Sequence, residues 1–240
     1  MDITKTIYTR KSIRKYKDTP VAQTMVDDIL EFAKKAQTLY PDIKIKFEIV
    51  LKEQVKCLFP WRPLQHLVLY SENKHGYLEN AGFVLQQVDL YIQSIGLGSC
   101  WLGLAKPEKL IINENGTTLE HTIMLCFGYP DEPYRNSLLE FKRSPMEKIS
   151  DTLDQRLEPA RFAPSAINSQ PWRFMYDGEI VHIYQNCKNH LRHLFLKQLN
   201  RIDTGIALAH LYVTNPNSFK FFITSAPKTS GLEYVGSFTL

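Results

Sequence analysis

A basic segment near the start of the chain carries residue types that bind phosphate. Arg10, Ser12 and Arg14 alternate along the sequence, so an extended backbone would place their side chains on one side. A guanidinium group donates paired hydrogen bonds to phosphate oxygens, and a hydroxyl group can add another. The spacing predicts a phosphate clamp, although a solvated basic surface loop is the alternative for this segment taken alone.

A second segment, residues 163–172, places small and polar residues between two prolines directly after an expected helix. It reads Ala-Pro-Ser-Ala-Ile-Asn-Ser-Gln-Pro-Trp and is called the A-P-S loop below. Proline stiffens the backbone, so the amides and side-chain carbonyls of this loop can face the edge of a flat heteroaromatic ring. The alternative is a helix-to-strand connection in which Asn and Gln only form turns.

The cysteines and histidines favour packing over chemistry. The four cysteines show neither a C-x-x-C pair nor zinc spacing, which indicates free core thiols and argues against a redox dithiol. They are Cys57, Cys100, Cys126 and Cys187. His190 and His193 have no nearby carboxylate or cysteine in the sequence, so we expect a surface coincidence and no metal site.

The composition is typical of a folded globular protein. Hydrophobic residues make up 44% and charged residues 22% of the 240 positions, which argues against disorder. A net charge of +4 is too small for a dedicated nucleic-acid binder and fits an anionic small ligand better. Residues 1–5 lack an apolar run, and no window approaches the ~18 apolar residues of a membrane span. We therefore expect a cytoplasmic protein without nucleic-acid or membrane partners.

Helices and antiparallel strands are expected to alternate without a regular βαβ rhythm, which predicts the α+β class. The spacing of apolar residues gives the segments. Helices are predicted over 4–10, 21–37, 78–95, 149–162 and 202–213, and strands over 44–50, 66–70, 120–128, on both sides of 177–178, and over 220–224. The apolar stripe of the 78–95 helix is wide, so this helix is expected to be central and buried.

Two stretches of the sequence resemble later stretches in the same order. Residues 30–36 align with 157–163 at an offset of 127, and residues 80–91 align with 203–212 if small gaps are allowed. Amphipathic helices can resemble each other by composition alone. Two matches in one order nevertheless favour an internal duplication.

Together, four motifs resemble those of the nitroreductase family of flavoproteins, and the resemblance spans most of the chain. They are the basic segment 10–16, the A-P-S loop, the Leu-Gly-Ser-Cys-Trp-Leu-Gly segment 97–103 and the Gly-Tyr-Pro segment 128–130. The resemblance implies antiparallel and mixed sheets flanked by helices.

The order of these motifs departs from the family, because the A-P-S loop comes last. Residues 37–40 replace it in the first half, and residues 142–144 keep only a remnant of the basic segment in the second. The chain is similar to a fused branch of the family in which two halves, 1–136 and 137–240, pack as one globular pseudo-dimer. Ordinary members are homodimers with flavin sites at the interface, so the resemblance implies a monomer whose single site uses both halves.

The resemblance also implies FMN as cofactor and NAD(P)H as co-substrate. The basic segment and Arg135 would hold the phosphate and ribityl chain, segment 99–102 would pass near the flavin N5, and the A-P-S loop would line the ring from the other half. The implied cofactor-binding residues are Arg10, Lys11, Ser12, Arg14, Ser99, Cys100, Trp101, Leu102, Arg135, Pro164, Ser165, Ala166, Asn168 and Gln170.

The implied activity is oxidoreduction, in which a hydride passes from NAD(P)H to flavin N5 and then to an electron-poor small molecule such as a nitroaromatic or quinone. No side chain is assigned as a general acid or base. The alternative is an FMN-binding storage or redox-sensing protein without efficient turnover, since a fold does not guarantee a reaction. Residues 37–40 are expected to meet 142–147 at a degenerate second site, which predicts one FMN per chain.

Overall fold

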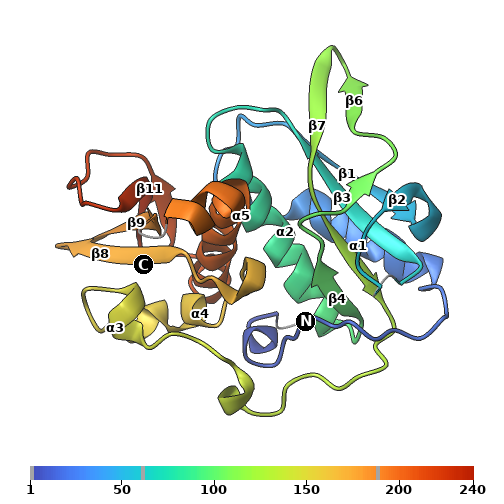
Figure 1. Ribbon diagram of the computed structural model, residues 1–240, viewed down its shortest axis with the longest axis horizontal. Coiled ribbons are helices and arrows are strands. Elements are labelled where there is room, and N and C mark those ends of the chain that lie inside the picture. Colours follow the sequence, from blue (N-terminus) through green and yellow to red (C-terminus); the bar gives the residue numbers. More distant parts are fainter. Residues whose placement is uncertain (1–2, 61–62, 188–189) are drawn as a thin grey trace.

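Two antiparallel sheets flank a pair of long helices in the computed structural model, which describes residues 3–60, 63–187 and 190–240 (Figure 1). The first sheet has the strand order β1-β3-β7-β4, with β6 also paired to β7, and the second has the order β10-β11-β9-β8. Helix α2 packs against the first sheet, α5 packs against the second, and the two helices pack against each other. This arrangement confirms the α+β class.

The helices are α1 (Gln23–Lys35), α2 (Tyr77–Ser94), α3 (Met146–Ile149), α4 (Glu158–Arg161) and α5 (His190–Thr214), with 3-10 turns at Lys5–Tyr8, Lys52–Gln54, Leu138–Glu140, Gln155–Leu157 and Ala166–Asn168. The strands are β1 (Ile45–Leu51), β2 (Val55–Lys56), β3 (Gln65–Ser71), β4 (Gly98–Trp101), β5 (Lys106–Pro107), β6 (Ile111–Glu114), β7 (Thr117–Gly128), β8 (Trp172–Asp177), β9 (Ile180–Asn186), β10 (Lys220–Phe222) and β11 (Leu232–Thr239). None of the described helices is long and apolar enough to cross a membrane.

The predicted helix over 149–162 is wrong. The chain forms α3, a 3-10 turn and α4 in this region, and Ser150 makes an isolated bridge to Phe174 of β8. Pro159 lies in the first turn of α4, where its missing N–H costs nothing, whereas a continuous helix would lose a hydrogen bond there and clash with the preceding turn. The strand predicted over 220–224 corresponds to β10, and a further strand, β11, follows it.

The two long helices approach each other closely at two glycines. A Cβ atom on Gly82 of α2 would lie 2.0 Å from the carbonyl oxygen of Ile202, and a Cβ atom on Gly205 of α5 would lie 2.0 Å from that of Glu79. No residue with a side chain fits either position without moving the backbone. The crossing therefore requires glycine at both positions.

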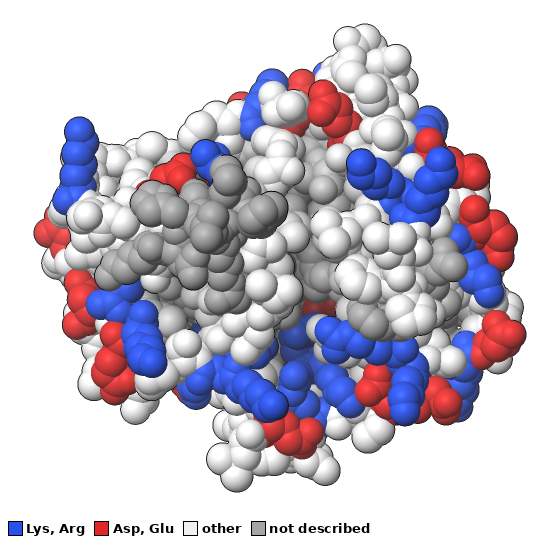
Figure 2. All heavy atoms as spheres, viewed as in Figure 1, with Lys and Arg blue, Asp and Glu red and all other residues white. Residues whose placement is uncertain are grey.

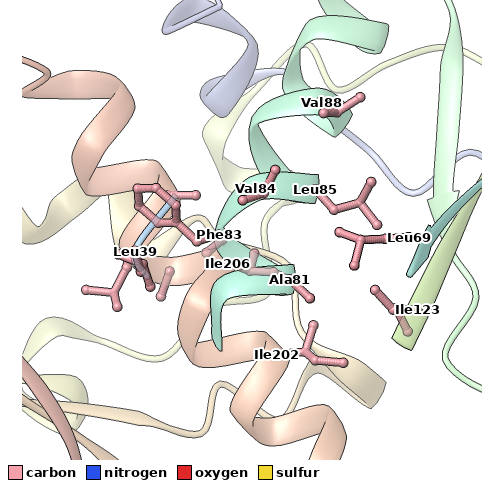
Figure 3. Close-up of a cluster of buried hydrophobic side chains, with 14 of the residues drawn as sticks. Leu39, Leu69, Ala81, Phe83, Val84, Leu85, Val88, Ile123, Ile202 and Ile206 are labelled. Carbon is pink, nitrogen blue, oxygen red and sulfur yellow. The ribbon is translucent and has the colours of Figure 1, made fainter. Parts of the chain in front are cut away.

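Helix α2 is buried along most of its length because it lies between α5 and the first sheet. Figure 3 shows Leu69 and Ile123 of the first sheet pointing toward Leu85 of α2, while Ile202 and Ile206 approach α2 from α5. The expected central helix is thus confirmed. Its polar residues are buried with the rest, so they need partners inside the protein.

Candidate functional site

The A-P-S loop is fixed to α5 by a buried carboxyl group. Both oxygens of Asp203 accept hydrogen bonds from the Ala166 amide at 3.1 Å, and one accepts from the Ser169 hydroxyl at 3.4 Å. Burial raises the pKa of Asp203 to about 8, against the opposing effect of these hydrogen bonds. Within the loop, the Ser165 hydroxyl accepts from the Gln170 amide at 2.9 Å.

The same loop contains backbone strain. Ile167, Asn168 and Gln170 have φ angles of 48°, 56° and 48°, in the left-handed region that residues with side chains rarely adopt. Such a conformation costs of order 1–3 kcal/mol per residue and persists where the surroundings determine it. Pro164 is buried at the start of the loop, while Ile167 and Asn168 are exposed. The loop is therefore a stiff platform with an accessible surface, as the spacing of its prolines indicated.

The basic segment is attached to β4. Ser12 forms an isolated parallel bridge with Ser99, and the Ile13 amide donates to the Ser99 carbonyl at 2.9 Å. Glu132 anchors the outer side of the segment, since it accepts from the Arg14 amide at 2.6 Å and pairs with the Lys11 ammonium group at 2.6 Å. The segments 10–16 and 97–103, which the resemblance assigns to one site, thus lie side by side.

Beneath this segment, Asp89 of α2 is the centre of a buried polar network. It pairs with the Arg10 guanidinium at 3.0 Å and accepts from the Ser99 hydroxyl at 2.6 Å and from the Gln86 side chain at 3.0 Å. Arg10 is only 1% exposed. The expected clamp residue therefore has a carboxylate partner inside the protein. Its guanidinium group is almost entirely buried beneath the segment.

Two further arginines join Arg10 in what we call the arginine cluster: Arg10, Arg135 and Arg143. The Arg135 guanidinium donates to the Arg10 carbonyl and lies 4.1 Å from the centre of the Phe141 ring. Arg143 lies 5.5 Å from the same ring. Burial and then the positive charge of Arg10 lower the pKa of Arg135 to about 10 and that of Arg143 to about 9. The groups thus lie close enough to repel one another.

The arginine cluster has unused donors. Arg10 Nη2 and Arg143 Nε are buried and have no hydrogen-bond partner among the described residues. A buried donor without an acceptor costs about 1–3 kcal/mol, more for a charged group. In Figure 2 Lys and Arg side chains gather below the centre of the visible face. An anion placed against the cluster would offset both the repulsion and the missing acceptors.

Arg143 connects this cluster to the A-P-S loop. It donates to Asn168 Oδ1 at 2.8 Å, Asn168 donates in return to the Lys142 carbonyl at 2.8 Å, and the Ser144 amide donates to Gln170 Oε1 at 2.7 Å. Segment 142–144 was expected at the degenerate site, but it lies against the A-P-S loop. The sequence prediction missed Arg143 because its neighbours look like a depleted basic segment. Its position soon after Arg135 and just before Pro145 is the signal that could have found it.

The remaining predicted residues lie in or beside β4. Trp101 donates from its ring nitrogen to Gln86 Oε1 at 3.2 Å and packs against the main core. Leu102 is buried, and its amide donates to the Met124 carbonyl at 3.0 Å. Cys100 is buried as a free thiol. The side chains of His190 and His193 lie outside the described residues.

Gln37 of segment 37–40 lines a cavity of about 300 Å³, which we call the counterpart cavity. Its lining is Ile3, Phe32, Lys35, Ala36, Gln37, Gln87, Tyr212, Val213 and Pro216. Among these lining residues Lys35 carries the only charge. The side chain of Gln87 donates to the Gln37 carbonyl at 2.9 Å and accepts from the Gln37 amide at 3.1 Å, so the polar groups here satisfy each other.

Comparison with known proteins gives related sequences and structures. The model of a family described as "Putative TM nitroreductase" matches residues 2–215. The "Putative NADH dehydrogenase/NAD(P)H nitroreductase" of Methanothermobacter thermautotrophicus is 26% identical over 168 residues, which cover 62% of this chain and 88% of that protein. Both its name and the family description are those of redox enzymes.

Two solved structures share the fold. A nitroreductase described as putative, from Thermotoga maritima, superposes with a TM-score of 0.66 at 21% identity and covers 99% of this chain and 92% of its own. A nitroreductase family protein from Clostridium difficile superposes with a TM-score of 0.50 at 18% identity, over 62% of this chain and 96% of its own. The family match over most of the chain shows that this protein belongs to the nitroreductase family and is an oxidoreductase of the nitroreductase type.

Proposed function

We propose that this protein is an FMN-dependent oxidoreductase that takes a hydride from NAD(P)H and delivers it to an electron-poor acceptor such as a nitroaromatic or quinone. The observation that carries the proposal is the arginine cluster, whose positive charge and unused donors favour a bound anion. The name of the Methanothermobacter relative, an NADH dehydrogenase/NAD(P)H nitroreductase, supports the redox class and the nicotinamide co-substrate.

The residues present fit the phosphate of FMN. Arg10 Nη2 and Arg143 Nε are buried donors without acceptors among the described residues, and phosphate oxygens would supply acceptors for both. Charge-assisted hydrogen bonds of this kind contribute about 1.5–3 kcal/mol each. Arg143 also holds Asn168. An anion at the cluster would therefore lie next to the A-P-S loop, where the flavin ring is expected.

Bound FMN supplies the hydride-accepting ring, and the chain's own residues position it. Arg10, Arg135 and Arg143 would bind the phosphate, while Ser12 and Arg14 would lie along the ribityl chain. The strained A-P-S loop, held by Asp203, would lie against the ring with its exposed surface at Ile167 and Asn168. No side chain of the cluster is suited to donate a proton near neutral pH, so the substrate proton would come from solvent.

We also infer that residues 1–136 and 137–240 form a pseudo-symmetric pair within one monomeric chain. A Cβ atom on Gly82 or on Gly205 would lie 2.0 Å from a carbonyl oxygen of the opposite helix. Asn80 of α2 accepts from the Leu39 amide at 2.9 Å, as Asp203 of α5 accepts from the Ala166 amide. These positions match at offsets of 123 for the helices and 127 for the loops, which supports duplication.

The test is flavin binding followed by turnover. Purified protein loaded with FMN should show a flavin absorption spectrum with one FMN per chain, and it should oxidise NADH or NADPH when an acceptor is added. Arg143→Ala should weaken FMN binding about tenfold or more, because one charge-assisted hydrogen bond contributes about 1.5–3 kcal/mol. Arg156→Ala is the matched control, since Arg156 pairs with Asp154 at the surface.

Four results would decide against the proposal or against one of its parts. Absence of FMN binding would remove the cofactor assignment, and unchanged affinity in Arg143→Ala would remove the cluster as the phosphate site. Tight FMN binding without nicotinamide oxidation would favour a storage or redox-sensing protein. Two FMN per chain would show that the counterpart cavity also binds flavin.

A further inference from the structure

Cys100 and Cys126 face each other on neighbouring strands of the first sheet. The antiparallel register of β4 and β7 pairs Cys100 with Cys126, and two residues further the Leu102 amide donates to the Met124 carbonyl at 3.0 Å. Hydrogen-bonded pairs alternate along an antiparallel ladder, so the two cysteines form such a pair, with Cα atoms about 5.5 Å apart. Disulfides span Cα separations of about 4.4–6.8 Å, so backbone geometry permits a bond.

The two thiols share one small hydrophobic cluster. Both are buried, at 3% and 0% exposure, and Cys57 and Tyr16 pack against the same cluster. The Tyr16 hydroxyl donates to the Ile13 carbonyl at 2.7 Å and lies 3.6 Å from Cys126 Sγ. The sequence argued against a redox dithiol because the cysteines form no C-x-x-C pair. The register of the sheet brings two of them together.

The two sulfurs differ in their readiness to ionise. A hydrogen bond with the Cys126 thiol, and then the charges of Arg14 and Arg10, lower the pKa of Cys100 below its usual value. Burial and then the neighbouring Cys100 raise the pKa of Cys126 well above its usual value. The thiolate is the reactive form of cysteine. This difference assigns the role of attacking sulfur to Cys100, and that of the second, resolving sulfur to Cys126, in the proposal that follows.

We propose that Cys100 and Cys126 are a redox-active dithiol that a hydroperoxide converts reversibly into a cross-strand disulfide. The Cys100 thiolate attacks one peroxide oxygen, so that an S–O bond forms, the O–O bond breaks and the leaving oxygen takes a proton. Cys126 sulfur then displaces hydroxide from Cys100, which forms the S–S bond, and the Cys126 proton leaves with the hydroxide as water. Two thiols supply two electrons to one peroxide, and an external dithiol reverses the reaction.

The inference does not depend on flavin binding, since peroxide is the oxidant. It does concern the proposed site, because Ser99, adjacent to Cys100, holds the Asp89 carboxylate that pairs with Arg10. A disulfide would tie β4 to β7 next to that network. The cross-link would fix strand β4, which carries both Ser99 and Cys100.

The test counts thiols and locates the bond. Reduced protein, freed of reductant, is treated with hydrogen peroxide, alkylated and digested for mass spectrometry. Reactive thiols in the denatured protein should fall from four to two, and a peptide pair joining Cys100 to Cys126 should appear and disappear again with dithiothreitol. Cys100→Ser and Cys126→Ser should each abolish that pair. Cys187→Ser is the matched control, because Cys187 lies just after β9 of the other sheet, and it should leave the pair unchanged.

Three outcomes would overturn the proposal. These are four thiols retained after peroxide treatment, a disulfide that includes Cys57, and sulfinic acid on Cys100 with Cys126 still reduced. The wild-type thiol count and peptide map decide between these outcomes and the expected one even where a serine variant fails to fold.

Discussion

Replacing Asp203 with Asn should stabilise the protein at neutral pH. Burial raises the pKa of the Asp203 carboxyl group to about 8, whereas an aspartate in an unfolded chain titrates near 3.9. Between about pH 4 and 8 the folded protein therefore binds more protons than the unfolded chain. Stability that is present below about pH 4 is lost as the pH rises through this window.

The size of the effect follows from the shift. Each pH unit changes the free energy of unfolding by up to about 1.4 kcal/mol, which gives up to about 4 kcal/mol between pH 4 and 7. Asparagine cannot ionise, yet it keeps an acceptor oxygen for the Ala166 amide. Asn80 already plays that part on the other side of the molecule, where its Oδ1 accepts from the amides of Leu39 and Tyr40 at 2.9 and 3.2 Å.

Denaturant unfolding at pH 5 and pH 8 measures the prediction. The advantage of Asp203→Asn over wild type should grow as the pH rises, and the difference between the two proteins removes the contribution of other titrating groups. Asn80→Ala is the control, because it removes a loop acceptor that does not ionise and should destabilise equally at both pH values. Parallel pH dependence in wild type and Asp203→Asn would refute the reasoning.

Two other substitutions test the buried framework of the site. Gly205→Ala should lower the melting temperature strongly, since the new Cβ would lie 2.0 Å from the Glu79 carbonyl oxygen; an unchanged melting curve would contradict the close helix crossing. Arg10→Ala should cost about 3–5 kcal/mol of folding stability even without FMN, because it leaves the Asp89 carboxylate buried without its cationic partner. An unchanged unfolding midpoint in denaturant would show that Asp89 is not held as a buried ion pair.

The chemical motifs were visible in the sequence because their residue types are uncommon at that spacing. The A-P-S loop has two prolines around small polar residues, and the basic segment has Arg10, Ser12 and Arg14 at alternate positions. Arg143 was missed because residues 142–144 look like a depleted remnant of the basic segment. Its role depends on the distance to Arg10 and Asn168, which only the fold sets.

Two errors in the predicted elements have local physical causes. The 149–162 segment has helical spacing of apolar residues, but Pro159 lies inside it and starts a new helix. Strand β11 was not among the predicted segments, although Leu232, Tyr234 and Phe238 recur with period two. Its register shifts between Tyr234 and Gly236, and such an irregularity depends on the pairing with β9, which the sequence alone does not reveal. The pairing of Cys100 with Cys126 likewise depends on strand register, which neither strand reveals alone.

Under the proposed duplication, the two sides of the helix pair carry different side chains at matching positions, and this difference supports the proposed single flavin per chain. On one side, the Gln87 side chain bonds to both the amide and the carbonyl of Gln37. The position that corresponds to Gln87 on the other side is His210, whose Nδ1 lies 2.8 Å from the Pro159 carbonyl oxygen. Burial, together with the charges of Arg10 and Arg143, lowers the pKa of His210 to about 3, against the opposing effect of its hydrogen bond to the Pro159 carbonyl, which places the histidine beside the arginine cluster. On the Gln87 side, Gln87 and Gln37 satisfy each other beside a largely apolar cavity, whereas the His210 side is positively charged and has unused donors. A phosphate-bearing ligand therefore gains its strongest contacts on the His210 side.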